Sequence, residues 1–360
     1  MKDSRILLWI FLGLLVSQLL IWTHIDYFDM AVWPAQTQVF HESNPDVYPS
    51  MDAYVHPGGP VIIGTLAIHD LGISYQTAVA LFIALSLSLI YFGSIILARK
   101  IRPHDWWLPL GIGITSFNRL YHFSTAPSVI ATALCVLLFF ITIYILQKRK
   151  VSWREVIIFG IVAGALIATR IDTGIIASVI CGCFVLPHLS FKKVLGIKAI
   201  ALFTFYILNP FAWHAPIRYV GEFIHTVITF SQHVPVQKLS LLDTLNMSYL
   251  ALISIGCAVY FFVKRIMHPL LKKNILLLLA LSVAFLCVFI PARYQAERYF
   301  TPVLFIWELL LPLFIATGVQ YIPLTLSKDY TREKAQKYIA YIFCFFIFEF
   351  QIIGLIFGYF

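Results

Sequence analysis

The sequence predicts an all-α integral membrane protein that crosses the bilayer about eleven times. Of its 360 residues, 60% are hydrophobic and only 12% are charged, which is too little polar surface for a soluble domain. Apolar runs long enough to span a bilayer recur along the chain, and Lys and Arg gather in alternate loops between them. Together these observations predict a single transmembrane domain over residues 1–360.

The candidate spans follow from the thickness of the bilayer. A spanning helix needs about 20 apolar residues, because every backbone polar group must be paired within the segment. The candidates are Arg5–Trp22, Thr77–Ala98, Trp106–Leu120, Pro127–Leu146, Glu155–Thr169, Thr173–Leu189, Val194–Phe211, Leu245–Val263, Asn274–Ile290, Thr301–Val319 and Tyr338–Tyr359. The first is expected to be retained, since it is too long for a signal-peptide core and lacks a cleavage pattern.

The basic residues predict the orientation, since Lys and Arg accumulate on the cytoplasmic side. With the N-terminus inside, 20 of the 26 basic residues fall on the inner side. The outer set is Arg119, Arg170, Arg218, Lys238, Arg293 and Arg298. We therefore expect a cytoplasmic N-terminus and an extracytoplasmic C-terminus, in the cytoplasmic (inner) membrane of a prokaryote.

Two outer loops stand out in this topology. The first covers residues 24–76 and contains Gly59–His69, which is apolar but too short to span. If that segment did span, most basic residues would move to the outer side, so we expect interfacial or re-entrant helices in this loop. The second large outer loop covers residues 212–244.

Charge and cysteine usage exclude several classes of protein. The net charge of +9 comes from inner loops that flank spans, so nucleic acid is not an expected partner. All six cysteines lie in apolar segments, which argues against a disulfide framework. Most acidic and histidine side chains outside the spans fall on the outer side, and we expect the chemistry there.

Three outer elements carry candidate functional residues. Asp26 and Asp29 follow the first span directly. The turn His56-Pro57-Gly58-Gly59-Pro60 opens the short apolar segment of the first outer loop. The third element, Pro291–Pro302, enters the tenth span and contains Arg293, Glu297, Arg298 and Tyr299.

In this order and on this shared side, the elements resemble the polyprenyl-phosphate-sugar-dependent glycosyltransferases of the GT-C class. That class includes protein O-mannosyltransferases and lipid A aminoarabinose transferases. The matching features are an early outer Asp (Asp29), the "HPGGP" turn, the "RY..P" signature at Arg298-Tyr299 and Pro302, and the fragment Gly160–Asp172, "GIVAGALIATRID". One departure is Asp29-Met30, where many relatives have Asp-Glu, so this chain lacks two adjacent carboxylates at that point.

The resemblance implies a GT-C-like fold and transfer of a sugar from a polyprenyl-phosphate carrier to a lipid or glycan acceptor. Asp29 would then be the catalytic base, with Asp26 as the fallback base or its partner, because inversion needs a carboxylate to take the acceptor proton. Substrate-binding roles would fall to His56, Arg170, Asp172, Arg293, Glu297, Arg298 and Tyr299. Arginine suits the departing phosphate, since its guanidinium is planar and permanently charged.

Each of these residues also has a structural interpretation. Asp26 and Asp29 could simply flank a span on its aqueous side, and Arg293 and Arg298 could be interfacial side chains. Arg170 and Asp172 could form an ion pair in a tight turn. His56 could merely fix the turn before Pro57.

Two other functional classes compete with the transferase. A glycolipid transporter or flippase would show paired halves and mid-membrane ionisable groups, whereas this chain shows no internal repeat. An oligosaccharide polymerase or ligase would use outer Arg and His without an early Asp. We predict no organic cofactor; the outer histidines leave a divalent metal open, although none has a typical ligand spacing.

Overall fold

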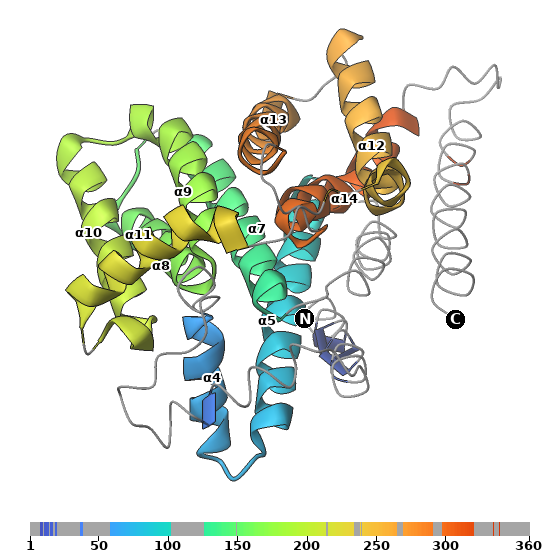
Figure 1. The fold of residues 1–360 in the computed structure, drawn as a ribbon. Helices are drawn as coiled ribbons and strands as arrows, with labels where there is room; N and C mark the ends of the chain where they lie inside the picture. Colours follow the sequence, from blue (N-terminus) through green and yellow to red (C-terminus); the bar gives the residue numbers. More distant parts are fainter. Residues whose placement is uncertain are drawn as a thin grey trace. The chain divides into compact units, whose positions relative to one another are not determined.

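The computed structural model describes residues 58–101, 126–148, 150–213, 215–233, 240–264, 269–290 and 297–319, with single positions elsewhere (8, 9, 11–13, 15, 16, 19, 37, 38, 238, 334 and 338). All regular secondary structure in these residues is helical (Figure 1). The elements are α4 (Gly59–His69), α5 (Tyr75–Ile101), α7 (Ala126–Leu146), α8 (Trp153–Thr169), α9 (Ile171–Val185), η1 (Leu186–His188), α10 (Phe191–Ile207), η2 (Pro210–Ala212), α11 (Pro216–His233), α12 (Leu241–Val263), α13 (Pro269–Phe289) and α14 (Glu297–Val319).

Eight of the eleven predicted spans coincide with a helix, namely α5, α7, α8, α9, α10, α12, α13 and α14. The other three, Arg5–Trp22, Trp106–Leu120 and Tyr338–Tyr359, lie outside the described residues apart from single positions. Among the described residues, three helices are long and apolar enough to cross a membrane: Tyr75–Gly93, Val129–Leu146 and Ile171–His188. The predicted all-helical class is therefore confirmed for the described residues and is compatible with a membrane protein, while the eleven spans stay a prediction.

The short apolar segment of the predicted first outer loop forms a helix with the predicted bounds, α4. Its end is fixed locally: His69 Nδ1 lies 2.8 Å from the Ile73 carbonyl, and the His69 ring stacks on Tyr75 at 3.8 Å. Gly72 has a φ of 82° in the turn between them, a conformation that glycine adopts without strain. This turn leads directly into α5.

The predicted second outer loop contains a helix that was not expected from the sequence, α11. Apolar side chains repeat on it at helical spacing, and Ile217, Val220 and Ile224 remain exposed. Arg218 and Glu222, which form a weak i,i+4 pair at 4.0 Å, lie on another part of its surface. Such an amphipathic helix is typical of segments that lie in a membrane interface.

The chain divides into two compact units. The first comprises residues 1–90, 123–240 and 276–303, and the second comprises residues 91–122, 241–275 and 304–360. In the second unit, Tyr91 packs on Phe305 and Phe261 packs on Phe314. The same unit buries the carboxyl group of Glu308, which is 1% exposed.

In the first unit, α8 lies between α9 and α10 (Figure 1). A Cβ added to Gly164 would lie 2.3 Å from the Ala201 carbonyl oxygen of α10, and one on Gly160 would lie 2.8 Å from Ile200. These glycines, four residues apart, let the two backbones approach closely. That is how small residues drive helix packing in membranes, where there is no hydrophobic force between helices.

The beginning of α8 is held by local polar contacts. The Glu155 carboxylate pairs with the Lys148 ammonium and accepts the Ser152 N–H at 2.7 Å, which satisfies a backbone donor at the helix start. Hydrogen bonding to Glu155 and Tyr144 raises the pKa of Lys148, so this ammonium stays charged. Lys193, at the start of α10, donates to the Val151 carbonyl and ties α10 to the same turn.

Candidate functional site

Most of the residues that the sequence singled out fall where the structure is not described. Asp26, Asp29, His56 and Arg293 lie outside the described residues. Glu297 and Arg298 begin helix α14, but their side chains lie outside the described part. The site can therefore be built from Arg170, Asp172, Tyr299 and the glycines of the "HPGGP" turn.

Arg170 interrupts the helical path between α8 and α9. Its backbone is extended, with φ −152° and ψ 107°. Its N–H donates to the Leu166 carbonyl at 2.9 Å, which closes α8, and its own carbonyl accepts the Gly174 N–H at 2.8 Å, which opens α9. One residue thus ends one helix and begins the next.

The sequence after Arg170 explains why the chain can turn back at this point. Asp172 lies in the first turn of α9, and its Oδ1 accepts the Thr173 N–H at 2.5 Å. The first backbone N–H groups of a helix have no partner within the helix, and acidic side chains stabilise the N-terminus by accepting hydrogen bonds from them. A Cβ on Gly174 would lie 2.5 Å from the Ile167 Cα, so only glycine allows α9 to pack this closely against α8.

The Arg170 guanidinium is buried, with 1% of its side chain exposed. Nε donates to Asp172 Oδ1 at 3.0 Å and Nη2 donates to Asp172 Oδ2 at 2.9 Å, which is the bidentate geometry that makes Arg–carboxylate pairs strong. The Asp172 side chain keeps 19% exposure. The ion pair that the sequence left as one alternative is therefore present, and its carboxylate is the partly exposed member.

Tyr299 packs against the arginine of this pair. Its ring centre lies 4.8 Å from the Arg170 guanidinium carbon, and the same ring stacks on Phe289 with 4.8 Å between ring centres. A desolvated guanidinium gains from such a cation–π contact. The "RY" signature of α14 is thus joined to the α8–α9 junction through its tyrosine.

The two glycines of the "HPGGP" turn reach the same junction. Gly58 caps α4 in the left-handed conformation, with a φ of 58°, and its N–H donates to the Thr169 carbonyl at 3.2 Å. A Cβ on Gly59 would lie 1.5 Å from the Leu208 carbonyl oxygen. The first glycine provides the conformation and the second provides the close approach, and together they place the N-terminus of α4 beside the junction.

Several buried polar atoms on the segments that meet here have no hydrogen-bond partner among the described residues. They are Thr173 Oγ1 on α9, Thr65 Oγ1 on α4, and both amide atoms of Asn209, which follows Leu208. Asn209 is fully buried. Since a buried polar group without a partner is costly, each of these atoms is suited to contact with water or with a polar group of a ligand.

The sequence analysis did not single out Asn209, Thr173 or Thr65. For Asn209 a signal existed, because Asn209-Pro210 ends an apolar run where an amide needs a partner. The two threonines have no such signal, since buried threonines are common in helices. Metal ligands do not emerge either: within the described ranges, no group of three His, Cys, Asp or Glu side chains could hold an ion.

Comparison with known proteins identified no relative of this chain. No family model matches the chain, and no curated protein and no solved structure shows significant similarity to it.

Proposed function

We propose that this chain is an inverting glycosyltransferase that moves a sugar from a polyprenyl-phosphate carrier to a lipid or surface-glycan acceptor. In this proposal the chain crosses a prokaryotic cytoplasmic membrane eleven times, with the N-terminus inside, and acts on the outer side. The strong inner bias of the basic residues and the ordered motifs of the sequence support it.

One observation carries the proposal: segments with three of the resembling motifs meet at the α8–α9 junction. Gly58 of the "HPGGP" turn bonds to Thr169, and Tyr299 of the "RY" signature covers Arg170. These segments are far apart in the sequence, so local structure does not require them to meet. Convergence of separate motifs on one buried cation is what a shared substrate site requires.

In the proposed reaction, the carboxylate of Asp29 takes the proton of the acceptor hydroxyl. The hydroxyl oxygen then attacks the anomeric carbon, and the bond from that carbon to the carrier's phosphate oxygen breaks. The electron pair leaves with the phosphate, so that polyprenyl phosphate is the leaving group. Cationic groups held in place before the reaction stabilise this developing charge.

Arg170 and Arg298 are the cations that we assign to the carrier phosphate. Arg170 is fixed by Asp172 and Tyr299, so it loses little conformational freedom when a phosphate binds beside it. The buried polar side chains of Asn209 and Thr173 are assigned to the sugar or to the water around it. Glu297 and Arg293 remain candidates for the same task.

A glycolipid transporter is the second candidate, and the break at Arg170 is the observation that favours it. Transporter sites are often built where a helix is interrupted near charged groups. The two functions differ in their product: a transporter moves the glycolipid intact, whereas a transferase releases free polyprenyl phosphate.

The test is a reconstituted transfer assay. The full-length protein in liposomes is supplied with a panel of radiolabelled polyprenyl-phosphate sugars and with lipid or glycan acceptors. We expect one donor to yield labelled acceptor and free polyprenyl phosphate. Movement of intact donor between leaflets without cleavage would identify a transporter and overturn the proposal.

Two variants assign the roles. Asp29→Asn is expected to abolish transfer while donor binding is retained, because it removes the base and keeps the side-chain shape. Arg298→Ala is expected to raise the donor concentration needed for half-maximal rate. Wild-type turnover in Asp29→Asn would remove Asp29 from the mechanism, and an unchanged donor response in Arg298→Ala would remove the phosphate contact.

A further inference from the structure

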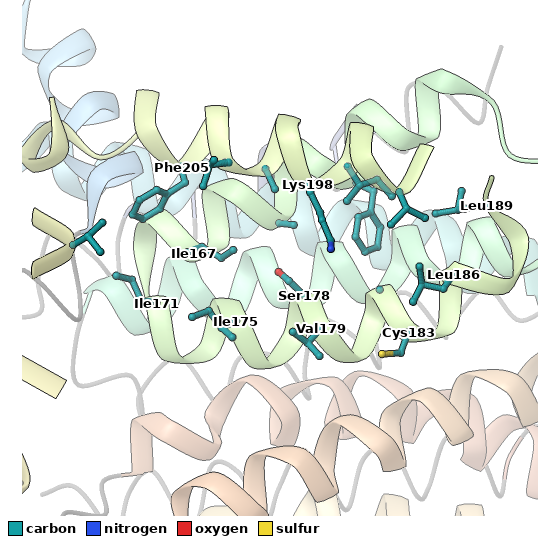
Figure 2. A pocket seen from close by; sticks show the side chains of 18 of the residues that line it. Ile167, Ile171, Ile175, Ser178, Val179, Cys183, Leu186, Leu189, Lys198 and Phe205 are labelled. Atoms are coloured by element: carbon teal, nitrogen blue, oxygen red, sulfur yellow. The ribbon is translucent and has the colours of Figure 1, made fainter. Parts of the chain in front are cut away.

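A cavity lies in the groove between α9 and α10, away from the polar contacts of the junction. Helix α8 forms its floor, and α11 closes one end (Figure 2). The cavity has a volume of about 650 Å³, which is within the range of ligand-binding pockets. It extends from Leu186 and Leu189, at the turn between α9 and α10, to Ile171 beside the junction.

The groove walls are the faces of two helices with regular apolar spacing. Ile171, Ile175 and Val179 line it from α9, and Leu202 and Phe205 line it from α10. The segment Ile171–His188, which forms one wall, is long and apolar enough to cross a membrane. A groove of this kind along a spanning helix suits a hydrocarbon chain.

Two polar side chains interrupt the apolar lining. The Lys198 side chain extends from α10 into the groove, and the Ser178 hydroxyl points into the same space from α9 (Figure 2). Ser178 Oγ is buried and has no hydrogen-bond partner among the described residues. Lys198 forms no ion pair with any residue in the described part of the chain.

The position of Lys198 argues against a purely hydrocarbon occupant. It lies seven residues after Phe191, the first residue of α10, which is about 10 Å along the helix axis. A lysine near a span end usually extends toward water, whereas this one turns into the groove (Figure 2). Lys198 is exposed in the protein alone, so its ammonium faces whatever fills the groove, and a prenyl or acyl chain alone supplies no counter-charge.

We propose that this groove binds an anionic phospholipid, with an acyl chain along the walls and the phosphate on Lys198 and Ser178. The phosphate supplies the counter-charge for the ammonium and the acceptor for the serine hydroxyl. Lys192, exposed at the start of α10, adds positive potential at the end of the groove where a lipid from that leaflet would enter. This site does not depend on the transferase activity proposed above.

The test uses the full-length protein in nanodiscs with photoactivatable phosphatidylglycerol, which carries a diazirine on one acyl chain. After illumination, labelled peptides are mapped by mass spectrometry. We expect labels on α9 and α10, and much weaker labelling by the matching phosphatidylcholine probe. Equal labelling by the two probes would mean that the groove binds acyl chains whatever the charge of the headgroup, and it would overturn the proposal.

Variants of one helix sharpen the test. Lys198→Met is expected to reduce labelling by phosphatidylglycerol about fivefold, and Lys198→Arg is expected to restore it. Lys192→Met is the matched control, since it removes the same charge outside the groove and should change labelling less. Equal losses in the two methionine variants would show that only general surface charge matters, and would contradict the proposal.

A further pair of measurements keeps the identity of the occupant testable. Val179→Trp places a large ring in the groove from a position that is 55% exposed, so it should block labelling and leave the fold intact. Polyprenyl phosphate added in equal amount should not displace phosphatidylglycerol. Displacement would identify the groove as a carrier-lipid site and overturn the phospholipid assignment.

Discussion

The two ends of α8 each carry an ion pair, yet the pairs differ in almost every respect. At the beginning, Lys148 and Glu155 are seven residues apart, and the lysine side chain is 33% exposed. At the end, the Arg170 side chain is 1% exposed and contacts Tyr299 from a distant segment. In the first pair, the Glu155 carboxylate also accepts a backbone N–H at the helix start, which is a common way to stabilise a helix N-terminus. The second buries a charge at a place where distant segments meet, which is a cost that a substrate site would explain.

The largest expected effect is at the buried pair. Asp172→Asn keeps the side-chain shape but leaves the Arg170 guanidinium without its carboxylate. We expect a loss of about 3 kcal/mol in unfolding free energy, the lower end for a broken buried pair because Asp172 keeps some exposure. Unfolding in mixed micelles measures this change. Stability equal to wild type would show that the carboxylate is not needed to hold Arg170.

A double variant separates burial of charge from packing. Arg170→Met combined with Asp172→Leu removes both charges, so no uncompensated ion is left. We expect this protein to be more stable than Asp172→Asn, because an apolar replacement of a buried pair is often neutral. Its proposed transferase activity should nevertheless be lost. If the double variant still transferred sugar, the Arg170–Asp172 pair would have only a structural role, like the Lys148–Glu155 pair at the beginning of α8.

The next effect is expected at the turn that contacts the junction. Gly59→Ala would put a Cβ 1.5 Å from the Leu208 carbonyl oxygen, so α4 must shift and the Gly58–Thr169 bond is expected to weaken. We predict a loss of about 2–3 kcal/mol, with faster hydrogen exchange at the start of α4. Gly182→Ala is the control, since its Cβ would meet nothing within 4 Å. Similar behaviour of the two variants would contradict the close approach.

A smaller effect is predicted for the middle of α8, between the two pairs. Gly164→Ala places a Cβ 2.3 Å from the Ala201 carbonyl oxygen, which pushes α8 and α10 apart. We expect a loss of about 1–2 kcal/mol, offset in part by the better helix propensity of alanine. Thermal unfolding in detergent reports it. A stabilised variant would mean that the two helices can separate at little cost.

The smallest effect is expected at the beginning of α8. Lys148→Met removes a partly exposed charge, and exposed pairs contribute little to stability. The change in unfolding midpoint should be much smaller than for Asp172→Asn, and it should fade further in high salt because salt screens exposed charges. A loss as large as that of Asp172→Asn would remove the contrast between the two ends.

Much of the helical architecture could be predicted from hydropathy alone. Spans such as Pro127–Leu146 and the short helix Gly59–His69 coincide with α7 and α4, because the apolar run itself sets the length of such a helix. Helix α11 was not predicted, since its apolar residues are spaced for an interface and give no continuous run. Hydropathy could not reveal the groove between α9 and α10 either, because a groove depends on how the helices pack and not on the length of their apolar runs.

The site was predictable only in part. Arg170 and Asp172 could be flagged as a pair from their spacing, but whether Arg170 is buried depends on Tyr299, which is distant in sequence. The roles of Gly58 and Gly59 become clear only when Thr169 and Leu208 are seen beside them. Asp29, Asp26, His56 and Arg293 lie outside the described residues, so their assigned roles stay predictions.

The central claim is that the α8–α9 junction holds the phosphate of a lipid-linked sugar donor. The most direct measurement is the dissociation constant of a short-chain polyprenyl phosphate for wild type and Arg170→Lys, at matched unfolding midpoints. Lysine keeps the charge but loses the planar fork, and we expect at least about tenfold weaker binding. An unchanged dissociation constant in a folded Arg170→Lys protein would contradict the claim.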